Sequence, residues 1–134
     1  MNNILLSNGV EMPPIVETTN WMDYPVMKKL MTAGLKIGFR AFDTARDYGN
    51  EDIVGQVMNE CLKELGLKRE DIFITTKIGN SQQALGNIEE QVNISLKNLQ
   101  TDYIDLWMMH WPYPDHYVDT WRKMEKVYKS GKVR

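Results

Sequence analysis

Apolar residues recur along the chain in two alternating patterns: short dense runs, typical of strands, and longer segments with the 3.6-residue period of amphipathic helices. The clearest helical segment is 51–65, which lies between Asn50 as the N-cap and Gly66 as the C-terminal stop. Similar periods predict helices over 24–33, where Gly34 is the expected stop, and over 88–99 and about 121–128.

Each of these helices follows a run rich in β-forming residues. The runs predict strands at 15–16 (continuing toward Thr19), 37–42, 72–76 and 103–109. The last is almost continuously apolar, which predicts a strand buried on both faces. Ahead of them, the pair Asn8-Gly9 between apolar residues predicts a β-hairpin over about 4–12. The expected organisation is one domain over 1–134, with a hairpin and four β/α units over about 14–131.

Strict alternation of strands and helices implies a parallel sheet with right-handed crossovers. Two α/β architectures fit this order: a small doubly wound sheet, or half of an eight-stranded barrel. The length of 134 residues favours the first, because a complete barrel needs about 250 residues. A glycine-rich phosphate loop would support a nucleotide-binding doubly wound sheet, but neither G-x-G-x-x-G nor G-x-x-x-x-G-K-[ST] occurs.

Composition narrows the possible functions. A net charge of −2 gives no drive toward nucleic acid or anionic membranes, and the single cysteine, Cys61, excludes an internal disulfide and any multi-cysteine zinc site. His110 and His116 match no zinc motif, so we expect no metal. The N-terminus does not resemble a secretory signal, and no apolar run approaches a membrane span. We therefore expect a cytoplasmic protein.

Three of the predicted strands end in an ionisable residue: Asp43, Lys77 and His110. Parallel strands bring their carboxyl ends to one edge of the sheet, where catalytic residues of α/β folds gather. Tyr48 follows Asp43 by five residues and can reach the same edge. A lysine cation makes a nearby tyrosine a stronger acid, an aspartate holds the lysine, and a neutral histidine can donate to a substrate oxygen. The set suits protonation of an oxygen that gains negative charge, as in hydride addition to a carbonyl.

Several segments resemble the aldo-keto reductase family, and the resemblance covers essentially the whole chain. The first is Gly38-Phe39-Arg40-Ala41-Phe42-Asp43-Thr44-Ala45, followed at the expected offsets by Tyr48, Glu51, Val54 and Gly55. The others are Thr76-Lys77 after a strand, and Leu99 to His110 followed by Trp111-Pro112.

The resemblance implies that the chain is the N-terminal half of a (β/α)8 TIM barrel, with the hairpin closing the bottom of the barrel. It also implies reduction of aldehydes or ketones with NADPH, or less often NADH. Tyr48 would be the proton donor, Lys77 and Asp43 would tune it, and His110 would orient and polarise the carbonyl. By the same resemblance Thr19 and Asp43 would contact the cofactor, and Trp21 and Trp111 would line the pocket for a small carbonyl substrate.

The sequence departs from the family in two places. Where the family usually has Gly-x-Gly-Thr, this chain has Val16-Glu17-Thr18-Thr19, so side chains could crowd the cofactor and a positive φ would be costly at Val16. The sequence ends at Arg134, before the fifth to eighth strands that carry most of the family's cofactor site. We therefore expect self-association, as a two-fold dimer that completes a pseudo-barrel, or pairing with a missing C-terminal half.

Two other interpretations remain open. The chain could be a catalytically inactive half-barrel that acts as a structural or interaction protein, which the missing cofactor residues favour. It could also be an independent doubly wound binding domain, against which the absence of a phosphate loop counts.

Overall fold

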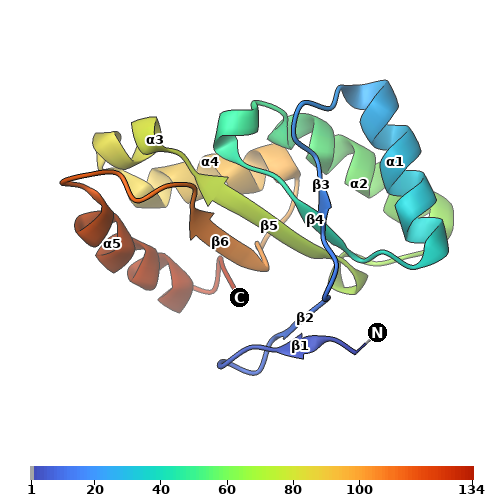
Figure 1. Cartoon of the computed structure of the whole chain (residues 1–134), viewed down its shortest axis with the longest axis horizontal. Helices are drawn as coiled ribbons and strands as arrows, with labels where there is room; N and C mark the ends of the chain where they lie inside the picture. Colours follow the sequence, from blue (N-terminus) through green and yellow to red (C-terminus); the bar gives the residue numbers. More distant parts are fainter. Residues whose placement is uncertain (1) are drawn as a thin grey trace.

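The computed structural model describes residues 2–134 as a β-hairpin followed by a parallel sheet and its helices (Figure 1). The hairpin pairs β1 with β2, and the sheet contains β3 to β6. The strands are β1 (Ile4–Leu5), β2 (Glu11–Met12), β3 (Glu17–Thr18), β4 (Ala41–Asp43), β5 (Phe73–Ile78) and β6 (Leu106–Met109). The helices are α1 (Tyr24–Ile37), α2 (Glu51–Leu65), α3 (Asn80–Leu85), α4 (Ile88–Leu99) and α5 (Tyr117–Lys129), with short 3-10 turns η1 (Arg46–Tyr48) and η2 (Arg69–Asp71).

The sheet has the strand order β3-β4-β5-β6, and every neighbouring pair is parallel. Helix α1 packs on α2, α2 on α4, and α4 on α5, so the helices follow one another around one side of the sheet (Figure 1). A doubly wound sheet changes strand order and carries helices on both faces. The sequential order and one-sided helices confirm the half-barrel.

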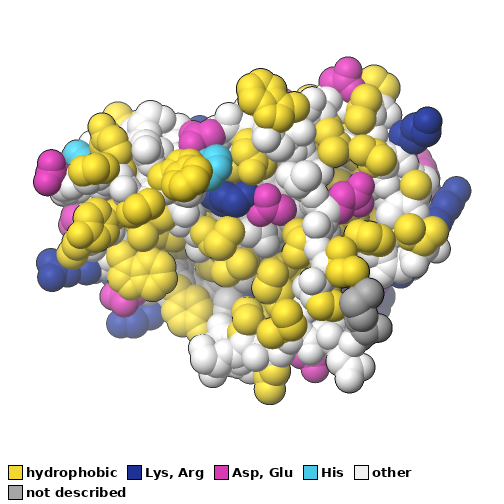
Figure 2. Space-filling view, in the orientation of Figure 1, with side chains coloured by type: hydrophobic (Ala, Val, Ile, Leu, Met, Phe, Trp, Pro, Cys, Tyr) yellow, Lys and Arg dark blue, Asp and Glu magenta, His cyan; other side chains and the backbone are white. Residues whose placement is uncertain are grey.

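The hydrophobic core fills the space between the sheet and the helices. Phe42 and Ile74 pair in register and point into it, while α1, α2, α4 and α5 supply the facing apolar residues. Its fully buried members are Met27, Met31, Leu35, Phe42, Val54, Val57, Met58, Cys61, Ile72, Ile74, Ile78, Ile88, Val92, Leu99 and Ile104. The opposite sheet face has no helix layer, and in Figure 2 acidic, basic and histidine side chains form a row across this largely hydrophobic face.

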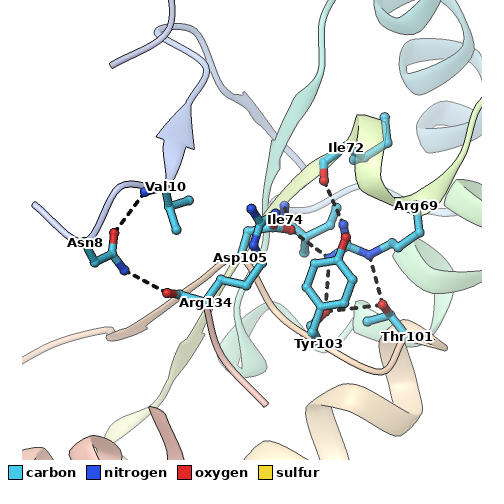
Figure 3. Close-up of polar contacts among 9 residues, drawn as sticks. All are labelled: Asn8, Val10, Arg69, Ile72, Ile74, Thr101, Tyr103, Asp105 and Arg134. Atoms are coloured by element: carbon cyan, nitrogen blue, oxygen red, sulfur yellow. Dashed lines mark hydrogen bonds and ion pairs between the residues drawn. The ribbon is translucent and has the colours of Figure 1, made fainter. Parts of the chain in front are cut away.

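A buried ion network lies before the start of β6 (Figure 3). The Asp105 carboxylate, whose side chain is fully buried, accepts hydrogen bonds from Arg69 at 2.8 Å, from Arg134 at 2.9 Å and from the Ile74 amide at 2.9 Å. Asn8 of the hairpin loop donates to the Arg134 carbonyl at 2.8 Å. The hairpin is therefore tied to the amino-terminal end of the sheet.

One isolated parallel bridge lies just before β6, on the side away from β5. Ile104 forms a parallel bridge with Val133: the Ile104 amide donates to the Lys132 carbonyl and the Arg134 amide donates to the Ile104 carbonyl, both at 3.0 Å. The next amide, that of Asp105, points the other way and donates to the Ile74 carbonyl of β5 at 3.2 Å. The last residues therefore lie where the next strand of a barrel belongs.

The helix predicted over 24–33 is longer than the sequence indicates. Gly34 does not stop it, and α1 continues to Ile37, where Gly38 adopts a left-handed conformation with φ 103° and its amide caps the last carbonyls. The predicted strand at 37–42 is correspondingly wrong at its start, since β4 begins at Ala41. The first strand of the sheet is Glu17–Thr18, the later part of the segment predicted from 15 toward Thr19, and residues 15–16 precede it.

The strand predicted over 103–109 is shorter and less buried than expected. It begins at Leu106, and Trp107 is the one buried residue of β6, because helices cover one face of the sheet. Helix α5 begins at Tyr117, four residues before the predicted start, and α3 was not predicted at all. Helix α3 has a polar sequence without an apolar period, so the pattern carried no signal for it. Among the described residues, no helix combines the length and apolar character needed to cross a membrane.

Candidate active site

Three ionisable side chains lie where neighbouring strands end. Asp43 is the last residue of β4, Lys77 is the next to last of β5, and His110 follows β6 directly. Asp43 pairs with Thr75, so Asp43 and Lys77 share the sheet face that points away from the helices. The His110 amide extends the ladder by donating to the Ile78 carbonyl at 2.9 Å. The structure therefore places the three residues at one edge, as the strand pattern predicts.

The Lys77 ammonium is the centre of the site. Its Nζ donates to Asp43 Oδ2 at 2.6 Å, to the Thr44 carbonyl at 2.9 Å and to the Tyr48 hydroxyl at 3.4 Å. The Lys77 side chain is only 11% exposed. All three ammonium hydrogens thus have an oxygen partner, and one of those partners is the phenol.

Tyr48 is presented by a tight turn between β4 and α2. It ends η1, and Gly49 follows in a left-handed conformation with φ 66°, which turns the chain toward α2. The Tyr48 ring meets the His110 ring edge-to-face with centroids 5.6 Å apart, and Lys77 Nζ lies 4.9 Å from its centroid. The phenol therefore lies next to both the cation and the imidazole.

The His110 ring has two further contacts. Its Nδ1 lies 3.0 Å from Asp47 Oδ2, and the Trp111 ring stacks nearly parallel to it with centroids 6.2 Å apart. Trp111 is 65% exposed, so one face of this stack is open to solvent. Gln83 of α3 is buried and donates to the Trp111 carbonyl at 2.9 Å, which fixes the loop after β6.

Thr19 lies against the site, and Trp21, two residues further along the same loop, has its side chain in solvent. The amide and hydroxyl of Thr19 both donate to the Asp43 carbonyl, at 2.9 and 3.1 Å, and Thr19 is buried. Trp21 is 93% exposed and has a left-handed φ of 62°. Val16 is not among the residues with positive φ, so the strain considered for a residue at a glycine position is absent there.

A buried carboxylate, that of Glu51, connects the loop carrying Tyr48 to the rest of the sheet and helices. Glu51 Oε1 accepts from the Thr76 hydroxyl at 2.7 Å, and Oε2 accepts from Ser95 at 3.2 Å and from Arg46 at 3.4 Å. Glu51 is the first residue of α2 and is 3% exposed. It therefore ties η1, β5 and α4 together directly below the site.

Asn50 has a different role from the one its position predicts. It occupies the N-cap position of α2, but its side chain makes no cap hydrogen bond. The amide instead donates to the carbonyls of Thr19 and Met22, at 2.8 and 3.2 Å. Asn50 therefore holds the first β–α loop against the second.

Sequence reasoning missed Asp47, Gln83 and the role of Glu51. Each makes its decisive contact with a residue at least 25 positions away in the chain. A local pattern carries no information about such contacts. The one available signal was the position of Asp47 directly before Tyr48.

Part of the site has the polarity needed to hold the carboxamide end of a nicotinamide. The Thr75 hydroxyl is buried and has no hydrogen-bond partner within residues 2–134, and it lies in the row next to Asp43. Thr19 and Asp43 supply the neighbouring polar groups. These residues fit that end of a dinucleotide, and the chain contains no glycine-rich phosphate loop for the rest.

Comparison with known proteins places these residues in a family. The model of the "Aldo/keto reductase family" matches residues 15–134. The glyoxal reductase of Bacillus subtilis is 40% identical over 99% of this chain, which corresponds to 47% of the relative's length. The methylglyoxal reductase DkgA of Escherichia coli O157:H7 is 45% identical over 75% of this chain and 35% of its own length. The chain thus spans about half the length, or less, of these relatives.

Solved structures agree with the sequence comparison. An aldose reductase from Schistosoma japonicum superposes with a TM-score of 0.91 at 31% identity, over 99% of this chain and 51% of the other. A Bombyx mori aldo-keto reductase in complex with NADP gives a TM-score of 0.88 at 29% identity, over 98% and 48%. With a parallel half-barrel and a family model that matches all but the hairpin region, this chain belongs to the aldo/keto reductase family.

Proposed function

We propose that this chain carries the proton-transfer site of an oxidoreductase that reduces aldehydes or ketones to alcohols. The observation that supports this most strongly is the Lys77 ammonium, which contacts both the Asp43 carboxylate and the Tyr48 hydroxyl. This arrangement gives a phenol a charged hydrogen-bond donor at its oxygen, and it serves a reaction in which the phenol loses its proton.

The proposed reaction needs a hydride and a proton. A reduced nicotinamide held beside Thr19 and Asp43 would supply a hydride to the carbonyl carbon, and the carbonyl oxygen would take up the resulting negative charge. Tyr48 transfers its phenolic proton to that oxygen, so an alcohol forms and a phenolate remains. Lys77, 3.4 Å from the phenolic oxygen, stabilises the phenolate, and Asp43 keeps the ammonium in place. His110, whose ring touches that of Tyr48, orients the substrate oxygen.

We propose NADPH as the cofactor, with NADH as the alternative. Thr19 and Asp43 would contact its nicotinamide end, because they lie beside Lys77 and present polar atoms there. Two solved neighbours are described as complexes with NADP and NADPH, which favours the phosphorylated form.

A small carbonyl compound is the proposed substrate class. The names of relatives, glyoxal reductase and methylglyoxal reductase, indicate small aldehydes. Trp111, stacked on His110 and largely exposed, would form one wall of the pocket. Trp21 would form another only after its loop closes toward the site, since its side chain now faces solvent.

We further propose that additional β/α units complete the sheet, supplied by a second copy or by a C-terminal half. In the described part of the chain β3 pairs with β4 alone, and the position beside β6 is taken only by the bridge at Val133. Open edges pair readily with other strands. A two-fold axis along the barrel would keep all strands parallel, so β6 of one copy would meet β3 of the other. Size-exclusion chromatography with light scattering tests this: a dimer supports a second copy, and a stable monomer excludes it.

The activity itself is tested by mixing the purified chain with NADPH and methylglyoxal and following cofactor absorbance. Consumption of NADPH that depends on both the aldehyde and Tyr48 is the expected result. No consumption by the chain alone, followed by activity when the C-terminal half of a relative is added, would assign the site to a completed barrel. No activity in either case would contradict the proposal and favour an interaction role.

A further inference from the structure

Asp47 is an acidic residue that directly precedes the proposed proton donor, Tyr48, and contacts the histidine of the site. It precedes Tyr48 in η1, and its Oδ2 lies 3.0 Å from Nδ1 of His110. The His110 side chain is 18% exposed and that of Asp47 is 39% exposed. The contact joins residues 63 positions apart, so it depends on the folded sheet edge.

The carboxylate of Asp47 occupies the space that a side chain on Gly79 would fill. A Cβ added to Gly79 would lie 1.9 Å from Asp47 Oδ1 and 2.5 Å from Gln82 Oε1. Gly79 has an ordinary φ of −82°, so its backbone conformation does not require glycine. The missing side chain at Gly79 is what leaves room for the carboxylate beside His110.

The chemistry of the pair fixes the direction of its hydrogen bond. A carboxylate has only acceptor oxygens, so Nδ1 of His110 must be the donor. A neutral imidazole has one N–H, and when Nδ1 carries it, Nε2 has only a lone pair. Nδ1 is thus committed to Asp47, and Nε2 is the one ring nitrogen left for a substrate.

We propose that Asp47 is a positioning residue that holds His110 in the Nδ1–H tautomer, an inference that rests on the proposed carbonyl reduction. In this tautomer the neutral ring accepts a hydrogen bond through Nε2 and cannot donate one to a carbonyl oxygen. His110 therefore donates to the substrate oxygen, and so orients it, only as the imidazolium, when both nitrogens carry hydrogen. With a neutral ring, Tyr48 is therefore the only proton donor to the substrate oxygen.

Among the groups around the His110 ring, Asp47 is the one that selects which ring nitrogen carries the hydrogen. The titratable and charged groups that contact the His110 ring are Asp47 and Tyr48 from η1. Next to them, the Lys77 ammonium lies 4.9 Å from the centroid of the Tyr48 ring and is paired with Asp43. The Lys77 ammonium is already bonded to three oxygens, and Trp111 offers only its ring face. Within the described residues no other side chain hydrogen-bonds the His110 ring.

The tautomer is measured directly by long-range proton–nitrogen NMR on the 15N-histidine-labelled chain, in alkaline solution where histidine rings are neutral. The chain has two histidines, so a His116→Gln variant assigns both. We expect His110 to show a pyrrole-like Nδ1 and a pyridine-like Nε2. An Nε2–H ring, or an even mixture of the two tautomers, would overturn the proposal.

Three variants test whether the position of the acceptor oxygen on residue 47, or its negative charge, fixes the His110 tautomer. Asp47→Ala should release His110 to the Nε2–H form, and Asp47→Asn should keep Nδ1–H because the amide oxygen still accepts. Gly79→Ala should act like Asp47→Ala while leaving Asp47 in the sequence, because the new methyl displaces the carboxylate. The His116 signals, from a ring stacked on Tyr113, should not change in any variant. An unchanged His110 tautomer in Asp47→Ala would also overturn the proposal.

This measurement needs neither cofactor nor turnover. A chain with the expected tautomer that fails to bind NADPH, both alone and with a supplied C-terminal half, would contradict the proposed function and leave the Asp47 assignment standing. A chain that reduces aldehydes while His110 carries its proton on Nε2 would do the reverse.

Discussion

Lys77 Nζ lies 3.4 Å from the phenolic oxygen of Tyr48 and 4.9 Å from the centroid of its ring. The cation therefore contacts the phenol at its oxygen and at its π face at once. No other tyrosine in the described chain makes a hydrogen bond to a lysine.

This relationship predicts the effect of removing one oxygen atom. Tyr48→Phe deletes the proposed proton donor and keeps the ring that packs on His110. We expect aldehyde reduction to fall by about 10²- to 10⁴-fold, with NADPH binding and the circular dichroism spectrum retained. Tyr103→Phe is the matched control, because that ring lies beside Arg69, far from the site, and it should keep full activity. Comparable losses in the two variants would argue against a specific role for Tyr48.

A second prediction concerns the buried carboxylate before β6. Asp105→Asn keeps the shape of the side chain and removes the charge that Arg69 and Arg134 both face. Breaking a buried pair leaves an uncompensated charge, so we expect a loss of about 3 kcal/mol in the free energy of unfolding, measured with urea. The control is Glu89→Gln, which removes the exposed pair with Lys132 and should cost less than about 1 kcal/mol. Similar midpoints for the two variants would contradict this reading of the network.

Two helical glycines predict opposite outcomes for the same substitution. A Cβ on Gly55 would lie 2.5 Å from the backbone oxygen of Asn98 and 2.6 Å from the carbonyl carbon of Leu99, so α2 and α4 must move apart. A Cβ on Gly34 would meet the movable carboxylate of Glu17 at 2.6 Å. We expect Gly55→Ala to lower the unfolding free energy by about 1–3 kcal/mol. Gly34→Ala should cost nothing or stabilise the chain by up to about 1 kcal/mol. Thermal unfolding of both variants provides the comparison. Equal shifts in Tm would show that the close approach of α2 to α4 does not require glycine at position 55.

A fourth prediction concerns pH. Burial raises the pKa of Glu17 above its ordinary value of 4.5, and Oε2 of this side chain has no hydrogen-bond partner within the described chain. The folded chain therefore binds more protons than the unfolded chain, and the free energy of unfolding falls as the pH rises through the interval between the ordinary and the raised pKa. Glu17→Gln removes this titration. We expect it to stabilise the chain at neutral pH by about 0.5 kcal/mol, since the side chain is only half-buried.

The advantage of Glu17→Gln should disappear below the ordinary pKa, where Glu17 is protonated in both states. Urea unfolding at neutral and at acid pH measures this difference. Asp102→Asn, at an exposed position, is the control and should leave the pH profile of unfolding unchanged. A Glu17→Gln curve parallel to that of the unchanged chain at every pH would contradict the prediction.

Periodic segments with clear end signals were predicted closely from the sequence. The interval 51–65 coincides with α2, and 88–99 coincides with α4. Both helices bury one apolar stripe, so their period reports their packing. The end of α1 was missed because Gly34 has a packing role inside the helix, while the stop is made by the left-handed Gly38. Helix α3 was missed because it has no apolar stripe of its own.

The site was predictable as far as it depends on strand ends. Asp43, Lys77 and His110 follow from three parallel strands that end at one edge, and Tyr48 follows from a short loop. Contacts between loops did not follow. The Asp47–His110 pair and the Gln83–Trp111 bond depend on how turns after different strands meet, which no local pattern encodes.

The most direct test of the account is a titration of the purified chain with NADPH, followed by nicotinamide fluorescence and by quenching of the four tryptophans. We expect saturable binding that survives Tyr48→Phe and weakens in Asp43→Ala, because the proposed function gives Asp43 a contact with the nicotinamide end and Tyr48 a part in the chemical step alone. Absence of binding up to millimolar cofactor, by the chain and by its complex with a supplied C-terminal half, would contradict it.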